Sequence, residues 1–223
     1  MKYSVIIPTY NEEKTIGKTL GNLLTHNAGF EIIVSDGKST DNTKKLIRTF
    51  PIKLIESEKG RGIQMNEAAK PAKGEILIFL HADTILPPNA FEVIEENFSD
   101  ENVKVATFGL MFDNTNLFLS IYSFFTRFET VFTTFGDQVI VVRKEFFDML
   151  GGFPKRKIFE DVAFLKEARK HTKILKLKPK VVTSSRRFEK SGYIKTQLNN
   201  LKYFLLYFSG KTDEEIYERY YGE

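Results

Sequence analysis

Two apolar runs of this sequence end in a carboxylate, at points where a β-strand would stop. Asp83 follows the unbroken run from Ile76 to Leu80 in "EILIFLHAD", and Asp36 follows "FEIIVS". A carboxylate at the end of a buried strand is costly unless water, a partner or a metal ion satisfies it. We expect Asp36 to accept hydrogen bonds from a base or a ribose, and Asp83 to hold a hard divalent cation that bridges phosphates.

The stretch "IIPTYNEE" at residues 6–13 carries a second set of candidate ligand contacts. Pro8 lacks a backbone N–H and takes the chain out of the strand ladder, which leaves the backbone of Thr9 and Tyr10 to meet a ligand. Glu12 is expected at the start of a helix that Asn11 caps. An ordinary strand-to-helix turn accounts for the same pattern equally well.

Basic residues stand in two loops. Lys59 and Arg61 lie between glycines in "EKGRGIQMN", just before an expected helix, which is a natural phosphate site. Arg186 and Arg187 follow an expected strand in "SSRRFEKSG". A solvated basic loop is the alternative for both pairs.

The remaining candidates are acids and polar residues of the second half. Glu160 and Asp161 open an expected helix in "IFEDVAF", where they serve either chemistry or the helix dipole. Asp137 and Gln138 begin an expected strand in "GDQVIVVR". For His81, beside Asp83, we favour a satisfied core histidine over a ligand contact.

The order of the elements predicts how these residues are positioned. Apolar periodicity favours strands at 3–8, 30–36, 52–57 and 75–80, with helices at 11–24, 39–50, 62–72 and 87–98 between and after them. This alternation predicts a mostly parallel sheet with helices on both faces. We interpret residues 1–223 as one domain, with a nucleotide-binding half at about 1–100 and an acceptor-binding half at about 101–223.

Composition narrows the chemistry. The 223 residues include no cysteine and three histidines, so thiolate chemistry is excluded and any metal should be bound through oxygen. The net charge of +4 suits a nucleotide diphosphate or an anionic membrane, and is too weak to indicate nucleic acid. The apolar runs are too short for a signal peptide or a spanning helix, so we expect a cytoplasmic protein.

Taken together in this order, the motifs resemble the family 2 glycosyltransferases of the GT-A nucleotide-diphospho-sugar transferase fold, over nearly the whole chain. The matching stretches are "PTYNE", "SDGKSTD", "LHADT" in place of the family's Asp-x-Asp metal motif, "GDQ", "GGFP" and "ED". A small bacterial branch that carries "GRxxQMN", "FLHADT", "GDQ" and "SSRRFEKxG" is the most similar.

The resemblance implies an inverting transfer of a sugar from a nucleotide-diphosphate donor to an unknown acceptor. It implies that Pro8 to Glu12 and Asp36 hold the base and ribose, and that Asp83 holds Mn²⁺ or Mg²⁺ on the diphosphate. Asp161 would be the general base, with Glu160 beside it. Lys59 and Arg61 would stabilise the leaving diphosphate, and Asp137, Gln138, Arg186 and Arg187 would contact the acceptor or phosphates.

Two departures from the family pattern leave alternatives open. His81 replaces the first acid of the metal motif, and the basic aromatic motif of processive members is absent, which favours transfer of a single sugar. A non-catalytic nucleotide-sugar binding protein is one alternative. A sugar nucleotidyltransferase is another, although the glycine-rich loop that those enzymes carry after the first strand is missing here.

Phenylalanine is unusually abundant, with 21 residues and a helical pattern at about 116–132 that includes Phe118, Tyr122, Phe125, Phe128 and Phe132. A second stripe, Ile194, Leu198, Leu201, Leu205 and Phe208, has Lys195 and Lys202 on its flank. Core packing is the interpretation we favour. A homodimer interface and a peripheral contact at the inner face of the membrane, where a lipid-linked acceptor would dock, remain open.

Overall fold

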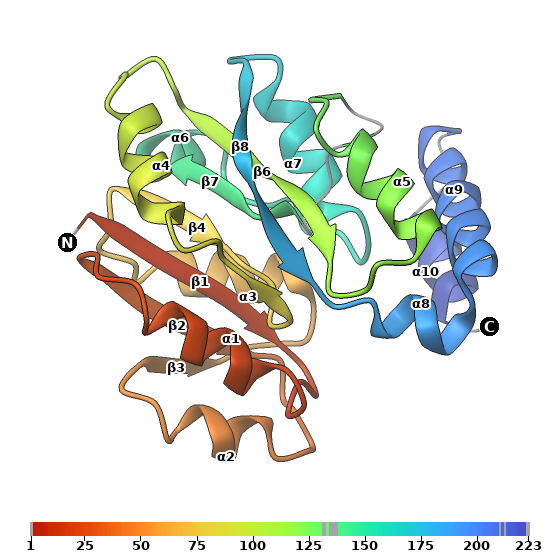
Figure 1. Ribbon diagram of the computed structural model, residues 1–223, viewed down its shortest axis with the longest axis horizontal. Coiled ribbons are helices and arrows are strands. Elements are labelled where there is room, and N and C mark those ends of the chain that lie inside the picture. Colours follow the sequence, from red (N-terminus) through yellow and green to blue (C-terminus); the bar gives the residue numbers. More distant parts are fainter. Residues whose placement is uncertain (1, 131–132, 134–137, 210, 212, 222–223) are drawn as a thin grey trace.

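A computed structural model describes residues 2–130, 133, 138–209, 211 and 213–221 (Figure 1). Within these residues the strands form one eight-stranded sheet in the order β3-β2-β1-β4-β7-β6-β8-β5. The strands are β1 (Tyr3–Thr9), β2 (Phe30–Asp36), β3 (Lys53–Glu56), β4 (Ile76–Phe79), β5 (Thr84–Ile85), β6 (Val105–Phe112), β7 (Ile140–Arg143) and β8 (Ile174–Thr183). The first four strands in that order are parallel, and β6 is parallel to β8. β7 is antiparallel to both of its neighbours, and β5 is antiparallel to β8.

Helices cover both faces of this sheet, as predicted. The described helices are α1 (Ile16–Leu23), α2 (Thr43–Ile47), α3 (Arg61–Ala69), α4 (Ala90–Phe98), α5 (Leu117–Phe125), α6 (Lys144–Met149), α7 (Glu160–Ala168), α8 (Arg186–Ser191), α9 (Tyr193–Phe208) and α10 (Asp213–Tyr221). Val5 and Ile7 of β1 pack in the core with α1 and α4, whereas Ile6 packs in the core with α3, α6 and α7. Alternate residues of the strand therefore enter two cores, which explains its continuous apolar sequence.

The start of the first helix differs from the expectation. α1 begins at Ile16 with Thr15 as its N-cap and no acid in its first turn, so Asn11 does not cap it. Asn11 has a φ of 56° instead, and its side-chain oxygen accepts a hydrogen bond from the Thr40 backbone N–H at 2.9 Å. The amide that we expected to begin a helix thus holds two strand-end loops together.

The Phe-rich helix is shorter than predicted. α5 ends at Phe125 and Thr126 caps it, so Phe128 follows the helix, and Phe132 lies outside the described residues. The short strand β5 and the helices α8 and α10 were not predicted. None of the described helices combines the length and the hydropathy that crossing a membrane requires.

Candidate active site

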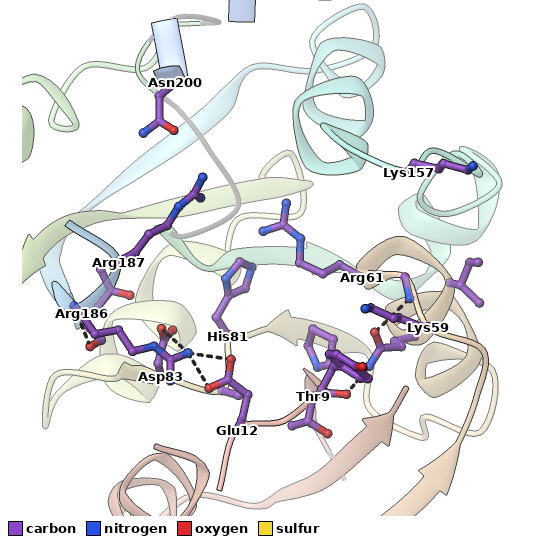
Figure 2. Close-up of a pocket in the computed structure, with 18 of the residues that line it drawn as sticks. Thr9, Glu12, Lys59, Arg61, His81, Asp83, Lys157, Arg186, Arg187 and Asn200 are labelled. Atoms are coloured by element: carbon purple, nitrogen blue, oxygen red, sulfur yellow. Dashed lines mark hydrogen bonds and ion pairs between the residues drawn. The ribbon is translucent and has the colours of Figure 1, made fainter. Parts of the chain in front are cut away.

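A cavity of about 720 Å³ opens at the carboxyl ends of β1 and β4 (Figure 2). Its wall contains most of the residues that the sequence singled out: Pro8, Thr9, Tyr10, Glu12, Lys59, Arg61, His81, Asp83, Arg186 and Arg187. β1 pairs in parallel with β4, with Ile6 opposite Phe79, so both strands end at the same edge of the sheet. Ligands of open α/β sheets bind at this edge.

Arg186 joins the two acids of the cavity floor. Its guanidinium lies 2.7 and 2.5 Å from the carboxylate oxygens of Glu12, and 3.5 Å from an Asp83 oxygen. Figure 2 shows it reaching from α8 between the two carboxylates. The segment "SSRRFEKSG" is therefore a helical start that docks on the floor, which corrects the solvated-loop alternative for Arg186.

His81 lies near the middle of the cavity in Figure 2, between the floor and Arg61. It is half-buried on the wall, so our interpretation of a core histidine is wrong. The strand β4 ends at Phe79 and Leu80 lies in the core, after which His81 and Asp83 are half-buried on the cavity wall while Ala82 between them stays in the core. The buried run that ends at Leu80 gave no sign in the sequence that His81 lies on the cavity wall.

Lys59 and Tyr10 form an exposed pair on another part of the wall. The Lys59 ammonium is 3.9 Å from the centre of the Tyr10 ring, close enough for a cation–π interaction. The two residues come from the loop before α3 and the loop after β1. An aromatic face beside a cation can stack a base and contact a phosphate.

Arg61 connects the cavity to the acidic pair of α7. Its Nε lies 2.8 Å from a carboxylate oxygen of Glu160, which is buried. Burial raises the pKa of Glu160, while the Arg61 guanidinium opposes the shift and the adjacent Asp161 adds to it. Glu160 and Asp161 lie outside the described wall of the cavity, so their predicted catalytic role stays a prediction.

Strained backbone accompanies the motifs. The described non-glycine residues with positive φ are Asn11, Lys38, Val139 and Phe159. Each of them lies in or next to one of the four motifs "PTYNE", "SDGKS", "GDQ" and "ED". Phe159, with a φ of 60°, directly precedes Glu160, and a bulky residue in this region costs free energy that the surrounding fold must supply. Such strain gathers at functional sites.

Two amides of α3 brace the site, and we did not assign them a role. Gln64 donates from Nε2 to the carbonyls of Thr9 and Ser35, at 2.7 and 2.8 Å, and so ties the ends of β1 and β2 to α3. Asn66 donates to the Phe153 carbonyl and accepts from the Phe153 N–H. The "GRGIQMN" motif therefore holds both the strand ends and the "GGFP" turn. The two amide side chains, two positions apart in this motif, were the feature of the sequence that could have indicated these hydrogen bonds.

Two predicted residues lie outside the described wall of the cavity. Asp36 is fully buried and accepts hydrogen bonds from the Ser39 N–H, the Ser39 hydroxyl and the Thr9 hydroxyl. Gln138 is buried and accepts a hydrogen bond from the Lys176 ammonium. Neither belongs to the described wall, and their predicted ligand contacts stay predictions. Asp137 lies outside the described residues.

The far side of the cavity comes from the second half of the chain and was missed. Its residues include Phe112, Tyr122, Arg156, Lys157, Phe188, Asn200 and Tyr217. The basic run "KRK" after "GGFP" was the one local signal for Arg156 and Lys157. The aromatic residues come from β6, α5, α8 and α10, which only the tertiary fold brings together.

A metal ion at this site would be held mainly by the phosphates of a bound ligand, with few protein side chains. The described residues contain no group of three or more His, Asp or Glu side chains arranged to hold a metal. Mg²⁺ commonly binds proteins through one or two carboxylates and completes its shell with phosphates and water. Asp83 on the cavity wall fits that mode, and the nearby Arg186 shows that its carboxylate already neighbours a cation.

The profile of "Glycosyl transferase family 2" matches residues 4–163, more than half of the chain. The chain belongs to glycosyl transferase family 2. This family 2 member is 35% identical over 114 residues to the poly(ribitol-phosphate) beta-N-acetylglucosaminyltransferase TarS of Staphylococcus aureus, a match that covers 45% of this chain and 20% of TarS.

A second relative is the UDP-Glc:alpha-D-GlcNAc-diphosphoundecaprenol beta-1,3-glucosyltransferase WfgD of Escherichia coli, 36% identical over 96 residues. That match covers 40% of this family 2 chain and 38% of WfgD. The aligned part is thus a fifth to two fifths of the length of these relatives.

Solved structures confirm the predicted GT-A fold. Staphylococcus aureus TarS 1–349 in complex with UDP-GlcNAc superposes with a TM-score of 0.66 at 25% identity, covering 82% of this chain and 58% of that one. The mannosyltransferase PcManGT of Pyrobaculum calidifontis, in complex with GDP-Man and Mn²⁺, superposes with a TM-score of 0.65 at 24% identity, covering 81% and 56%. The second likeness, at that identity, shows the fold alone.

Proposed function

We propose that this chain transfers one sugar from a nucleotide-diphosphate donor to an acceptor hydroxyl, with inversion at the anomeric carbon. The observation that carries the proposal is the cavity at the strand ends, whose wall combines Lys59, Arg61 and Arg187 with the acids Glu12 and Asp83. A nucleoside diphosphate is the anionic group that such a wall would bind, and TarS was solved with a donor of this class, UDP-GlcNAc.

The cations would stabilise the leaving group. As the acceptor oxygen forms its bond to the anomeric carbon, the bond from that carbon to the diphosphate breaks and its electron pair stays on the phosphate oxygen. Fixed positive charge near that oxygen lowers the barrier because the charge is in place before the reaction. Arg61 is suited to this role because Glu160 orients its guanidinium through a 2.8 Å contact.

A bound Mn²⁺ or Mg²⁺ would neutralise the diphosphate further. Asp83 would hold it, and Arg186 would give up part of its contact with Asp83, because two cations cannot share one carboxylate closely at low cost. Glu12 would keep Arg186 through its two closer oxygens.

The acceptor hydroxyl must lose its proton to a base. We assign this role to Asp161, at the start of α7, by the family resemblance, and we assign Glu160 to positioning Arg61. A single inverting displacement needs one such carboxylate and no enzyme nucleophile. The alternative, a protein that binds the donor without turnover, differs in this step alone.

Donor binding and turnover test the proposal separately. A panel of UDP- and GDP-sugars, each with Mn²⁺, is screened by thermal shift, and release of nucleoside diphosphate is then measured with the donors that bind. We expect at least one donor to raise the melting temperature in a metal-dependent way and to release its diphosphate. Metal-dependent binding without any release from that donor would favour the non-catalytic alternative. No binding by any donor would contradict the proposed function.

Asp83→Ala tests the metal assignment. The variant should lose the metal-dependent part of the donor-induced shift, because the diphosphate then meets Glu12 without the neutralising ion. Asp148→Ala is the matched control, since Asp148 is an exposed acid of α6 outside the described cavity wall. Equal metal dependence in the Asp83 variant and the control would contradict a metal role for Asp83.

A further inference from the structure

A large apolar surface covers the outer sides of α5 and α9. Fifteen large hydrophobic side chains are exposed in the described part of the chain, and eleven of them lie on these two helices or on the turn after α5. We call this surface the α5–α9 face. It consists of Leu117, Phe118, Ile121, Phe124, Phe125, Phe128, Ile194, Leu198, Leu201, Leu205 and Phe208.

The two helices lie side by side (Figure 1) and contact each other, so both sets of exposed residues belong to one region of the protein. On α9 the exposed residues repeat every three or four positions, which places them along one side of the helix. Leu198, for example, is 61% exposed. A single exposed leucine is ordinary on a protein surface and would need no explanation. Eleven exposed apolar side chains on two adjacent helices are more than scattered exposure explains, and such a gathering marks an interaction surface.

Other contacts already hold both helices to the protein. On α5, Leu119 is 1% exposed in the core, and the Ser123 hydroxyl donates to the Leu110 carbonyl at 2.5 Å. On α9, Tyr203 and Phe204 are buried. The outward residues therefore belong to anchored helices with a fixed orientation, and a different packing of these helices is not needed to explain the surface.

The charges on the two helices themselves have one sign. The charged residues of α9 are Lys195 and Lys202, and α5 has none. Arg127, after α5, lies with its guanidinium 3.8 Å from the centre of the Phe124 ring. The acids of the neighbouring α10 include Glu214 and Glu215, which pair with Lys157 and Lys211.

Cations beside an apolar surface fit an anionic partner. In a two-fold contact between two copies of the α5–α9 face, neither α5 nor α9 of either copy would offer an acid to these lysines. An anionic bilayer suits both the apolar side chains and the cations of this face. Its acyl chains can surround the aromatic and aliphatic side chains while its headgroups contact the lysines.

We propose that the α5–α9 face docks on the surface of an anionic bilayer. Docking itself does not depend on the proposed function. One consequence does rest on it: Tyr122 of α5 and Asn200 of α9 line the cavity, so the acceptor side of the cavity would open next to the membrane. A lipid-linked acceptor could then enter from the bilayer.

Vesicle flotation tests the docking. The chain is mixed with vesicles of phosphatidylglycerol and phosphatidylethanolamine in equal parts, or of phosphatidylcholine alone, and centrifuged through a density gradient. We expect it to float with the anionic vesicles at low salt and to be released as salt screens the lysines. Wild-type protein that stays at the bottom with anionic vesicles at low salt would overturn the proposal.

Paired variants separate the two contributions. Lys195→Gln with Lys202→Gln should lower the partition coefficient about thirtyfold, because each lysine near an anionic surface contributes roughly five- to sixfold. Its control is Lys18→Gln with Lys53→Gln, which removes the same charge from α1 and β3. Equal loss in both pairs would mean non-specific attraction by net charge and would overturn the assignment to this face.

Leu198→Ser with Leu201→Ser should lower partitioning on the order of tenfold per side chain. Its control, Leu24→Ser with Met149→Ser, removes two exposed apolar side chains elsewhere and should leave flotation unchanged. Both variants should stay folded by circular dichroism.

If sedimentation instead shows a wild-type dimer that the Leu198 pair converts to monomer, without flotation, the face is an interface between copies and the proposal is wrong. Nucleoside diphosphate release with a soluble acceptor is measured in parallel, so loss of docking and loss of transfer are distinguished.

Discussion

The edge of the sheet at β1 and β4 and the α5–α9 face use apolar residues in opposite ways. At the sheet edge the apolar side chains are buried, and the polar groups beyond them bond to one another: Gln64 to the ends of β1 and β2, Arg186 to Glu12, and Arg61 to Glu160. On the α5–α9 face the apolar side chains are exposed and the cations of α9 have no acid on their own helix.

This difference separates two kinds of surface. In the cavity, buried partners such as Glu160 and Gln64 already orient the side chains and strand ends of the wall. The α5–α9 face lacks a covering layer, because anchored helices present it outward. Substitutions of reactive groups in the cavity should change activity with little change in the free energy of unfolding. Polar substitutions on the α5–α9 face should leave the free energy of unfolding nearly unchanged and weaken only the binding of this face to its partner. The predictions below test this contrast.

Asp161→Asn should give the largest effect. The variant keeps the size of the side chain and loses the ability to take a proton, so transfer should fall by about a hundredfold to ten-thousandfold while donor affinity is retained. Steady-state nucleoside diphosphate release and calorimetry of donor binding measure the two quantities. Glu167→Gln is a control on the solvent side of the same helix, where the acid pairs with Lys170.

Glu160→Gln tests the division of roles within the acidic pair. Because Glu160 holds Arg61, its loss should weaken donor binding together with turnover, and the loss should depend on Arg61 being present. Turnover that falls further in Glu160→Gln than in Asp161→Asn, with donor affinity unchanged, would show that the roles of the pair are reversed.

Leucine substitutions compare the two regions on one scale of stability. Leu20 of α1 is 0% exposed, whereas Leu198 is 61% exposed. Leu20→Ala should lower the free energy of unfolding by about 2–5 kcal/mol, since it leaves a cavity in the core. Leu198→Ala should change it by less than about 0.5 kcal/mol. Urea unfolding of both variants measures the difference, and a loss of several kcal/mol at Leu198 would mean that the α5–α9 face is part of the core.

The same contrast explains what the sequence could predict. The strand ends were predictable because an apolar run and the polar residue that ends it are both local, and the parallel pairing of β1 with β4 then aligns Thr9 and Asp83 at one edge. In the second half, the periodicity of α5 and α9 identified their apolar sides. It did not show that these sides face outward, because periodicity indicates an apolar stripe and says nothing of what covers it.

Long-range contacts account for the other differences. The contact of Arg186 with Glu12 joins residues 174 positions apart, so no local pattern could reveal it. The end of α5 at Phe125 follows from Ser123 and Thr126, whose hydroxyls contact the Leu110 carbonyl of a neighbouring strand. The spacing of the aromatic residues contains no information about these two hydroxyls or about the strand that they contact.

Glycine substitutions test the brace between α3 and the "GGFP" turn. Gly151 and Gly152 both have positive φ, 78° and 76°. A Cβ on Gly152 would lie 2.6 Å from the Asn66 oxygen, whereas a Cβ on Gly151 would have nothing within 4 Å. Both Ala variants incur about 1–2 kcal/mol of backbone strain. Gly152→Ala should cost about 1–2 kcal/mol more, because it also disturbs the Asn66 brace. Equal losses would show that the brace is dispensable for stability.

Two buried glutamines carry the comparison into the interior. Gln64 donates to two backbone carbonyls at the sheet edge. Gln138 accepts from the ammonium of Lys176, which also donates to the Phe108 carbonyl at 3.4 Å. At the sheet edge a neutral amide satisfies two backbone carbonyls, whereas in the second half a buried glutamine contacts a partly buried cation.

That cation predicts a pH dependence of stability. Burial lowers the pKa of Lys176 from 10.5 to about 7, with Glu129 opposing the shift and Arg169 adding to it. Between pH about 7 and 10.5 the unfolded chain then binds more protons at this residue than the folded chain, so the contribution of Lys176 makes the protein more stable as pH rises. The slope should be up to about 1.4 kcal/mol per pH unit. Lys176→Met keeps an unbranched side chain that is one atom shorter and removes the titrating group, so the free energy of unfolding of the wild type should rise relative to the variant across this window. Urea unfolding at several pH values measures both curves. Parallel curves would mean that Lys176 stays charged in the folded protein, held by Gln138 and Glu129, and that the second half pairs its buried charge as completely as the sheet edge does.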